Sequence, residues 1–119
     1  MNVASFYKGW QFTNQRLIAR IGALSPEQLA LRAAPNLWPI WAITAHSAMV
    51  RVYWLCDVCQ EPGAGRTPFT NAADEAWEDD LTHPRGPEEL VPALESTWTI
   101  VDDVLNRWTP DMLQGENFE

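Results

Sequence analysis

The sequence has few basic residues and no cluster of them. Eight Lys and Arg stand against 16 Asp and Glu, which gives a formal net charge of −8 over 119 residues. Nucleic acids bind proteins largely through Lys and Arg that neutralise phosphates, and anionic membranes attract basic patches. We therefore expect no nucleic acid and no membrane among the partners of this chain.

A long uninterrupted apolar run and a basic leader are also lacking. The most apolar stretch, from Trp38 to Leu55, contains Thr44, His46 and Arg51, whereas a membrane-crossing helix needs about 20 mostly apolar residues. The first residues, Met-Asn-Val-Ala, have none of the positive charge that opens a signal peptide. The sequence therefore predicts a cytoplasmic protein.

Familiar catalytic motifs are missing as well. The chain contains no H-E-x-x-H, no G-x-S-x-G and no Gly-rich phosphate loop after a strand. Its two cysteines, Cys56 and Cys59, form a C-x-x-C that follows a helix-like segment, whereas a thioredoxin-type motif stands at a helix N-terminus. A redox pair and two small apolar residues near a helix end both remain open interpretations, and the second is favoured.

What the chain has in quantity is apolar residues, 46% of the total with seven Trp, at helical spacing. The spacing predicts long helices near residues 3–23, 39–58 and 87–107, with no sheet. Between them, glycines, prolines and acids predict a long connection over residues 60–86, with room for a short helix around Trp77. A cap-compatible residue followed by Pro and an acid marks three helix starts: Ser25-Pro26-Glu27, Gly86-Pro87-Glu88 and Thr109-Pro110-Asp111. We expect a single all-α domain over residues 1–119, an up-down helical bundle.

The second predicted helix is apolar nearly all round, with Arg51 its one formal charge between Pro39 and Leu55. Two neighbouring helices leave part of such a circumference uncovered. After the start signal at Thr109 the chain stops at Glu119, so we expect a further covering helix to be missing, or a homodimer that packs the second-helix faces together. Arg51 itself is expected at the helix surface or in an ion pair.

The segment Asn36-Leu37-Trp38-Pro39-Ile40-Trp41-Ala42-Ile43-Thr44-Ala45-His46, with Leu24-Ser25-Pro26-Glu27-Gln28-Leu29 upstream, resembles the first half of the DinB/YfiT-like superfamily. In that family a Trp opens the second helix and a His follows on its inner face. The resemblance covers residues 3 to 113. It implies an antiparallel four-helix bundle, often dimeric, that binds a divalent metal (Zn, Ni or Fe) through one histidine on the second helix and two on the fourth. Known relatives include thiol-dependent S-transferases and a mycothiol-dependent isomerase, which implies a small-molecule thiol as substrate.

Only His46 carries over from the family's three ligands, because the one other histidine, His83, lies in the long connection. The apolar neighbours of His46 on its helix predict that it points inward, with Met49 and Tyr53 as candidates to line a pocket. The acids from Asp74 to Asp80 are expected on a solvated loop face. Since one imidazole does not hold a metal, we expect no tight metal binding by this chain alone.

Two functions follow from these observations. The first is a DinB-like metal-dependent enzyme, of the thiol-dependent S-transferase, isomerase or hydrolase type, with an incomplete metal site on this chain. The alternative is a non-catalytic helical dimerisation or interaction module of the same ancestry.

Overall fold

The computed structural model describes residues 2–70 and 76–114 of the chain. Within that part the fold is all-α, as predicted, and the only β pairing is an isolated bridge between Arg32 and Pro39. No helix in the same residues is long and apolar enough to cross a lipid bilayer.

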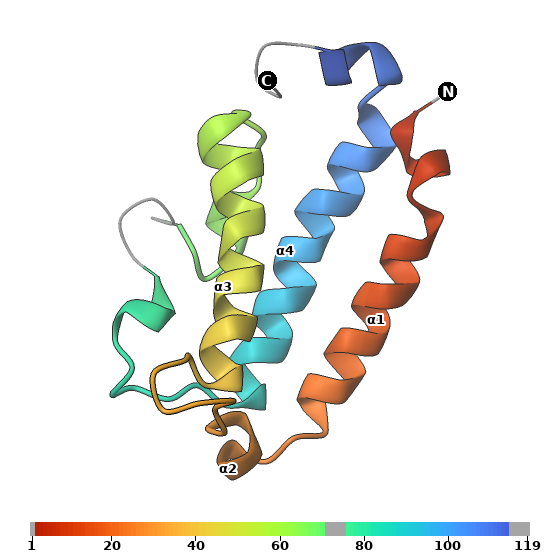
Figure 1. Ribbon diagram of the computed structural model, residues 1–119. Helices are drawn as coiled ribbons and strands as arrows, with labels where there is room; N and C mark the ends of the chain where they lie inside the picture. The colour runs from red at the N-terminus through yellow and green to blue at the C-terminus, as the bar shows by residue number, and fades with distance from the viewer. Residues whose placement is uncertain (1, 71–75, 115–119) are drawn as a thin grey trace.

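Three long helices form the bundle (Figure 1): α1 (Lys8–Gly22), α3 (Ile40–Val52) and α4 (Pro87–Arg107). The third begins and ends at the expected residues, with Pro87 in its first turn and Gly86 as N-cap. The structure also has short helical turns, which are η1 (Val3–Phe6), α2 (Pro26–Leu29), η2 (Tyr53–Val58), η3 (Ala64–Arg66), η4 (Trp77–Asp79) and η5 (Pro110–Gln114).

The first two predicted helices are each interrupted. Residues before Tyr7 form the 3₁₀ turn η1, because the Asn2 side chain accepts from the Ala4 N–H and the Val3 N–H is bonded to the Trp108 carbonyl. After Val52, α3 widens into the π-helical turn η2, in which the Cys59 N–H bonds to the carbonyl of Trp54 five residues earlier. The expected helix near Trp77 is the short η4, and residues 71–75 lie outside the described part.

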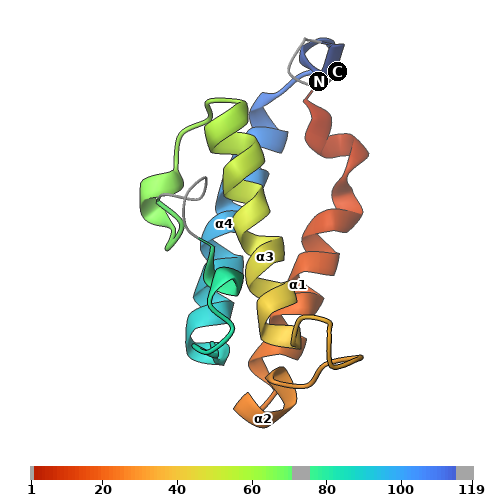
Figure 2. The ribbon, with the colours of Figure 1, turned by 60° about the vertical axis from the view of Figure 1, so that its left-hand side comes forward.

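The direction of α4 differs from the up-down order that we expected. Arg51 bonds to Leu94 and Thr97, and Glu61 farther along the chain bonds to Arg107 and Trp108, so α3 and α4 run the same way. Only α1 is antiparallel to both (Figures 1 and 2). The physical reason is the long connection between η2 and α4, which carries the chain back along the bundle before α4 begins.

The core lies where α3 meets α4. Small side chains, Ala42, Ala45 and Ala48 on α3 and Ala93 on α4, are fully buried and let the two helices approach closely. Larger side chains fill the space around them; the biggest fully or almost fully buried ones are Trp41, Phe69, Leu29, Leu90, Leu94 and Val52. Phe69 comes from the connection, so that segment packs against the bundle.

Arg51 joins all three long helices, which corrects the expectation of a surface or ion-paired residue. Its Nη1 donates to the Leu94 carbonyl at 3.0 Å and to Thr97 Oγ1 at 3.2 Å, and its Nη2 donates to Asn14 Oδ1 at 2.8 Å. Asn14 is 5% exposed and Thr97 is fully buried. Burial lowers the pKa of the Arg51 guanidinium, and no carboxylate in the described residues pairs with it.

A second polar contact closes the end of the bundle near η5. Glu61 accepts from Arg107 Nη2 and from Trp108 Nε1, both at 2.7 Å, and the Glu61 side chain is only 13% exposed. Burial on its own raises the pKa of Glu61, but the bonds from Arg107 and Trp108 outweigh it and hold the pKa below its usual value.

This lowered pKa predicts a pH dependence of stability. The Glu61 carboxylate contributes to the free energy of unfolding above its unfolded-state pKa of about 4.3, and the contribution is lost as the pH falls through the lower folded-state pKa. We expect Glu61→Gln to cost roughly 1–3 kcal/mol at pH 7 and to flatten the loss of stability in acid. Urea unfolding at several pH values measures both effects, with Glu95→Gln, at an exposed position on α4, as the control. Equal acid sensitivity in wild type and Glu61→Gln would contradict this role.

Candidate functional site around His46

The His46 side chain lies at the edge of the bundle, on the side of α3 that faces the connection. Its Nδ1 lies 2.5 Å from Glu78 Oε2. The imidazole side chain is 44% exposed, whereas the Glu78 side chain is 3% exposed. A half-exposed imidazole is therefore hydrogen-bonded to a buried carboxylate.

This pairing favours one tautomer of the ring. An ionised carboxylate only accepts hydrogen bonds, so the Nδ1 of a neutral His46 is the donor and its Nε2 keeps a lone pair. Within the described residues Nε2 has no hydrogen-bond partner. In that tautomer His46 presents its Nε2 lone pair on the side of the ring away from Glu78.

Trp38 completes the immediate surroundings of the imidazole. Its ring centroid lies 5.2 Å from that of His46, at an angle of 57° between the planes. Trp38 precedes Pro39, the N-cap of α3, and is 39% exposed. The aromatic contact restricts rotation of the imidazole.

Two expectations from sequence are corrected here. His46 does not point fully into the core, because its side chain is 44% exposed, although Ala42 and Met49, its neighbours on the same side of the helix, are buried. Glu78 is not on a solvated loop face, because η4 packs it against α3. Asp79 and Asp80 are exposed as expected, and Asp74 and Glu75 lie outside the described residues.

A complete metal site is not formed by the described residues. Among them no group of three or more His, Cys, Asp and Glu side chains is placed to hold a metal ion. His83, the other histidine, is exposed in the connection. One carboxylate oxygen, Glu78 Oε1, is buried without a hydrogen-bond partner within the same part of the chain, so the polar groups around His46 are not fully satisfied.

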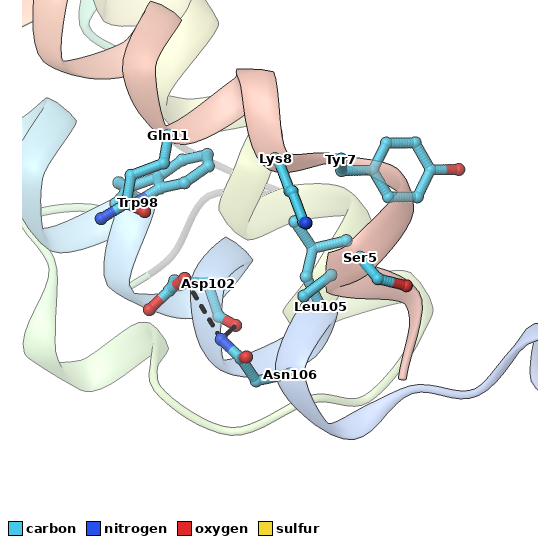
Figure 3. Close-up of a pocket in the computed structure, with 9 residues that line it drawn as sticks. Ser5, Tyr7, Lys8, Gln11, Trp98, Asp102, Leu105 and Asn106 are labelled. Atoms are coloured by element: carbon cyan, nitrogen blue, oxygen red, sulfur yellow. Dashed lines mark hydrogen bonds between the residues drawn. The ribbon is translucent and has the colours of Figure 1, made fainter. Parts of the chain in front are cut away.

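The two other candidate pocket residues differ in burial. Met49 is 9% exposed and belongs to the core, while Tyr53 is 36% exposed and its ring contacts Trp54 edge to face at 5.3 Å. Neither lines the pocket of about 370 Å³ between the start of the chain and α4 that Figure 3 shows. In that pocket Asn106 donates to Asp102, and the Tyr7 ring points away from the pair. His46 is not among its lining residues.

The cysteines are free thiols at the end of α3 and its π-helical turn. Burial raises the pKa of Cys56, and the carboxylates of Asp57 and Glu61 add to the rise, which a backbone hydrogen bond with Ala64 partly offsets. Burial and Glu61 also raise the pKa of Cys59. A raised pKa disfavours the thiolate, the form that reacts in redox chemistry.

The comparisons with known proteins identify the family. A family model described as the DinB superfamily matches residues 10–117, which is most of the chain. No curated protein and no solved structure is similar enough to match.

The raised cysteine pKa values predict low reactivity at neutral pH. We expect both thiols to react with iodoacetamide several times more slowly at pH 7 than a free cysteine, whose pKa is about 8.5, and the rate to rise with pH beyond that value. Cys56→Ser and Cys59→Ser separate the two rates by mass spectrometry. A rate that is half-maximal near pH 7 would instead favour a redox pair.

Proposed function

The chain belongs to the DinB superfamily, and on this premise we propose that it is a metal-binding DinB-type protein in which His46 supplies one ligand through Nε2. The proposed reaction class is the family's chemistry on a small-molecule thiol, of the S-transferase, isomerase or hydrolase type. A divalent metal (Zn, Ni or Fe) would supply a Lewis acid with an open position there.

One observation carries this proposal, the bond between His46 and the buried Glu78. Histidines that bind metals almost always donate their second ring N–H to a carboxylate, a carbonyl or water, which fixes the tautomer and orients the ring. Glu78 stands in that relation to His46, and Nε2 faces away from it. The role of Glu78 is therefore to position His46.

The other ligands must come from outside the described residues, because these form no three-residue cluster. What this chain does by itself is to hold one imidazole in a defined orientation between a carboxylate and an indole. The Oε1 of Glu78 is buried and lacks a partner in the described residues. This supports a carboxylate that interacts electrostatically with a neighbouring cationic group.

The tautomer of His46 tests the proposal without any metal. We expect ¹⁵N NMR to show His46 protonated on Nδ1 when neutral, and Glu78→Gln to weaken or reverse that preference, because an amide can also donate. His83 is the internal reference, since it is exposed. An Nε2-protonated His46 in the wild-type chain would overturn the proposed ligand role.

Metal titration tests the ligand itself. With Zn²⁺ or Ni²⁺ we expect only weak binding to the wild-type chain, loss of the site in His46→Ala, and about 10- to 100-fold weaker binding in Glu78→Gln. His83→Ala is the matched control and should bind like wild type. A submicromolar single site that depends on His46 would contradict the view that this chain holds an incomplete set of ligands.

We also propose that the chain forms a homodimer through the outer face of α3. Large apolar side chains stay exposed along it: Ile43 at 51%, Tyr53 at 36% and Trp54 at 57%. Contiguous exposed apolar surface of this kind marks an interaction site. For a chain of charge −8, a face of α3 and η2 with a single exposed acid, Asp57, is one where two copies approach with less repulsion. A twofold arrangement also brings a second His46 to the same face.

The α3 face alone supports the alternative function, a dimerisation module without chemistry. The two functions differ in one respect. In a pure module, His46→Ala and Glu78→Gln leave every binding property of the dimer unchanged, whereas in the metal-binding protein both variants alter metal affinity and leave the dimer intact.

A charge placed on this face tests the dimer. We expect wild-type chain to be dimeric at micromolar concentration in light scattering, and Trp54→Glu to weaken the dimer by at least about tenfold, because it buries an unpaired carboxylate. Leu31→Glu makes the same kind of change at a side chain 60% exposed elsewhere, and should leave the dimer intact. A wild-type monomer at all concentrations would refute the interface.

A further inference from the structure

A groove runs over α4 between α1 and α3, and His46 is not part of it. Its first part, a pocket of about 420 Å³, is lined by residues of all three helices, among them Trp10, Thr13, Arg51 and Trp98. An adjoining pocket of about 290 Å³ shares Trp10 with the first and is lined almost wholly by apolar side chains, including Leu55 and Leu105. Figures 1 and 2 show α1 and α3 diverging toward the end where η1 and η5 lie, which is where this second pocket opens.

Arg51 is the one formally charged residue among the described residues that line these two pockets. Its bonds to Asn14, Leu94 and Thr97 hold the guanidinium in place but neutralise no charge, because the acceptors are an amide, a carbonyl and a hydroxyl. Within the described part of the chain it makes no ion pair. Nε also has no hydrogen-bond partner there, and the Arg51 side chain lines the wall of the first pocket. An anion can therefore reach a guanidinium that is already oriented.

The surroundings of Arg51 select what kind of anion fits. Trp98 lies under the guanidinium, with its ring centroid 5.9 Å from the Arg51 Cζ, and Trp10 is 51% exposed on the opposite helix. Thr13, exposed on α1, adds a hydroxyl donor to the same pocket. Polar groups at one end and apolar side chains at the other match an elongated ligand with an anionic head and an apolar body.

We propose that this groove binds a small amphipathic carboxylate, whose carboxylate pairs with Arg51 and whose apolar body lies between Trp10 and Trp98 and extends toward Leu55 and Leu105. Guanidinium and carboxylate match in geometry and form strong, charge-assisted hydrogen bonds. The apolar body supplies the hydrophobic part of the binding free energy. The site is independent of the metal ligand proposed at His46.

Two other arrangements compete with this one. In the first, Arg51 is only a structural tie between the helices, and the groove binds nothing or binds apolar molecules without regard to charge. In the second, a carboxylate of another copy of the chain occupies the groove. The experiment below separates both from the proposal.

Octanoate is the probe, because its straight apolar tail is matched by the elongated groove and because it does not absorb where Trp does. Calorimetry on the full 119-residue chain measures affinity, and the indole N–H signals of Trp10 and Trp98 in NMR locate the probe. We expect octanoate to bind at least about tenfold more tightly than the neutral octan-1-ol, and acetate, which has no tail, to bind at least about tenfold more weakly than octanoate.

Variants test whether the charge of Arg51 is what binds the carboxylate of octanoate. Arg51→Gln should weaken octanoate binding at least about tenfold. Because Arg51 also supports the fold, a second pair of variants avoids it: Thr13→Glu places a carboxylate beside the guanidinium and should abolish octanoate binding, while Thr13→Gln has the same size without the charge and should bind within about threefold of wild type. Thr13 is exposed, so both variants should fold, which circular dichroism checks.

Three results would overturn the proposal. Equal affinity for octanoate and octan-1-ol, or an undiminished affinity in Thr13→Glu, would mean that the groove takes apolar groups without using Arg51. Absence of octanoate binding to the folded wild-type chain would leave Arg51 as a structural tie. A dimer that Thr13→Glu dissociates and Thr13→Gln does not would assign the groove to a second copy of the chain.

Discussion

The Arg51 guanidinium is the contact on which the arrangement of the three long helices depends. It leaves α3 and reaches Asn14 on α1 and Leu94 and Thr97 on α4. Burying a charge is costly unless polar groups replace the lost water, and here an amide, a carbonyl and a hydroxyl do so. Because these acceptors have fixed places on α1 and α4, they set both the rotation of α3 and its position along the bundle. A shift of α3 by one turn, about 5.4 Å, would leave Arg51 buried without them.

The rotation of α3 also determines which of its faces carries the candidate site. His46 precedes Arg51 by five residues, which places the two side chains about 140° apart around the helix. With Arg51 turned to the groove, His46 must face the connection, where η4 brings Glu78 to it. The connection is able to do this because α3 and α4 run in the same direction, so the chain has to pass back along the bundle. The length of the connection therefore allows both the parallel order of α3 and α4 and the contact between Glu78 and His46.

The helices were predictable because two independent signals agree, namely the apolar spacing and the Pro-acid helix starts. For α4 the predicted first and last residues are the observed ones. The role of His46 as a metal ligand stays a prediction, made from the resemblance carried by Trp38 and its neighbours. Glu78 did not, because it lies 32 residues from His46 in an acidic segment whose composition is typical of a solvated loop. The role of Arg51 was predicted wrongly, because a single charge on an apolar helix is as compatible with a surface ion pair as with a buried residue that links helices. The direction of α4 was predicted wrongly because a connection of this length permits either direction.

An acidic chain and an anion-binding groove are compatible because of how the charges are distributed. The Debye length is about 8 Å at physiological ionic strength, so exposed carboxylates act on a ligand only weakly once they lie farther away than that. A partly buried guanidinium is screened much less, and no acid lines the described walls of its groove. Arg51 is therefore the one formal charge on those described walls, while the net charge of −8 governs how whole chains approach each other. The proposed dimer face on α3 and the proposed anion site at Arg51 are thus governed by different electrostatic terms.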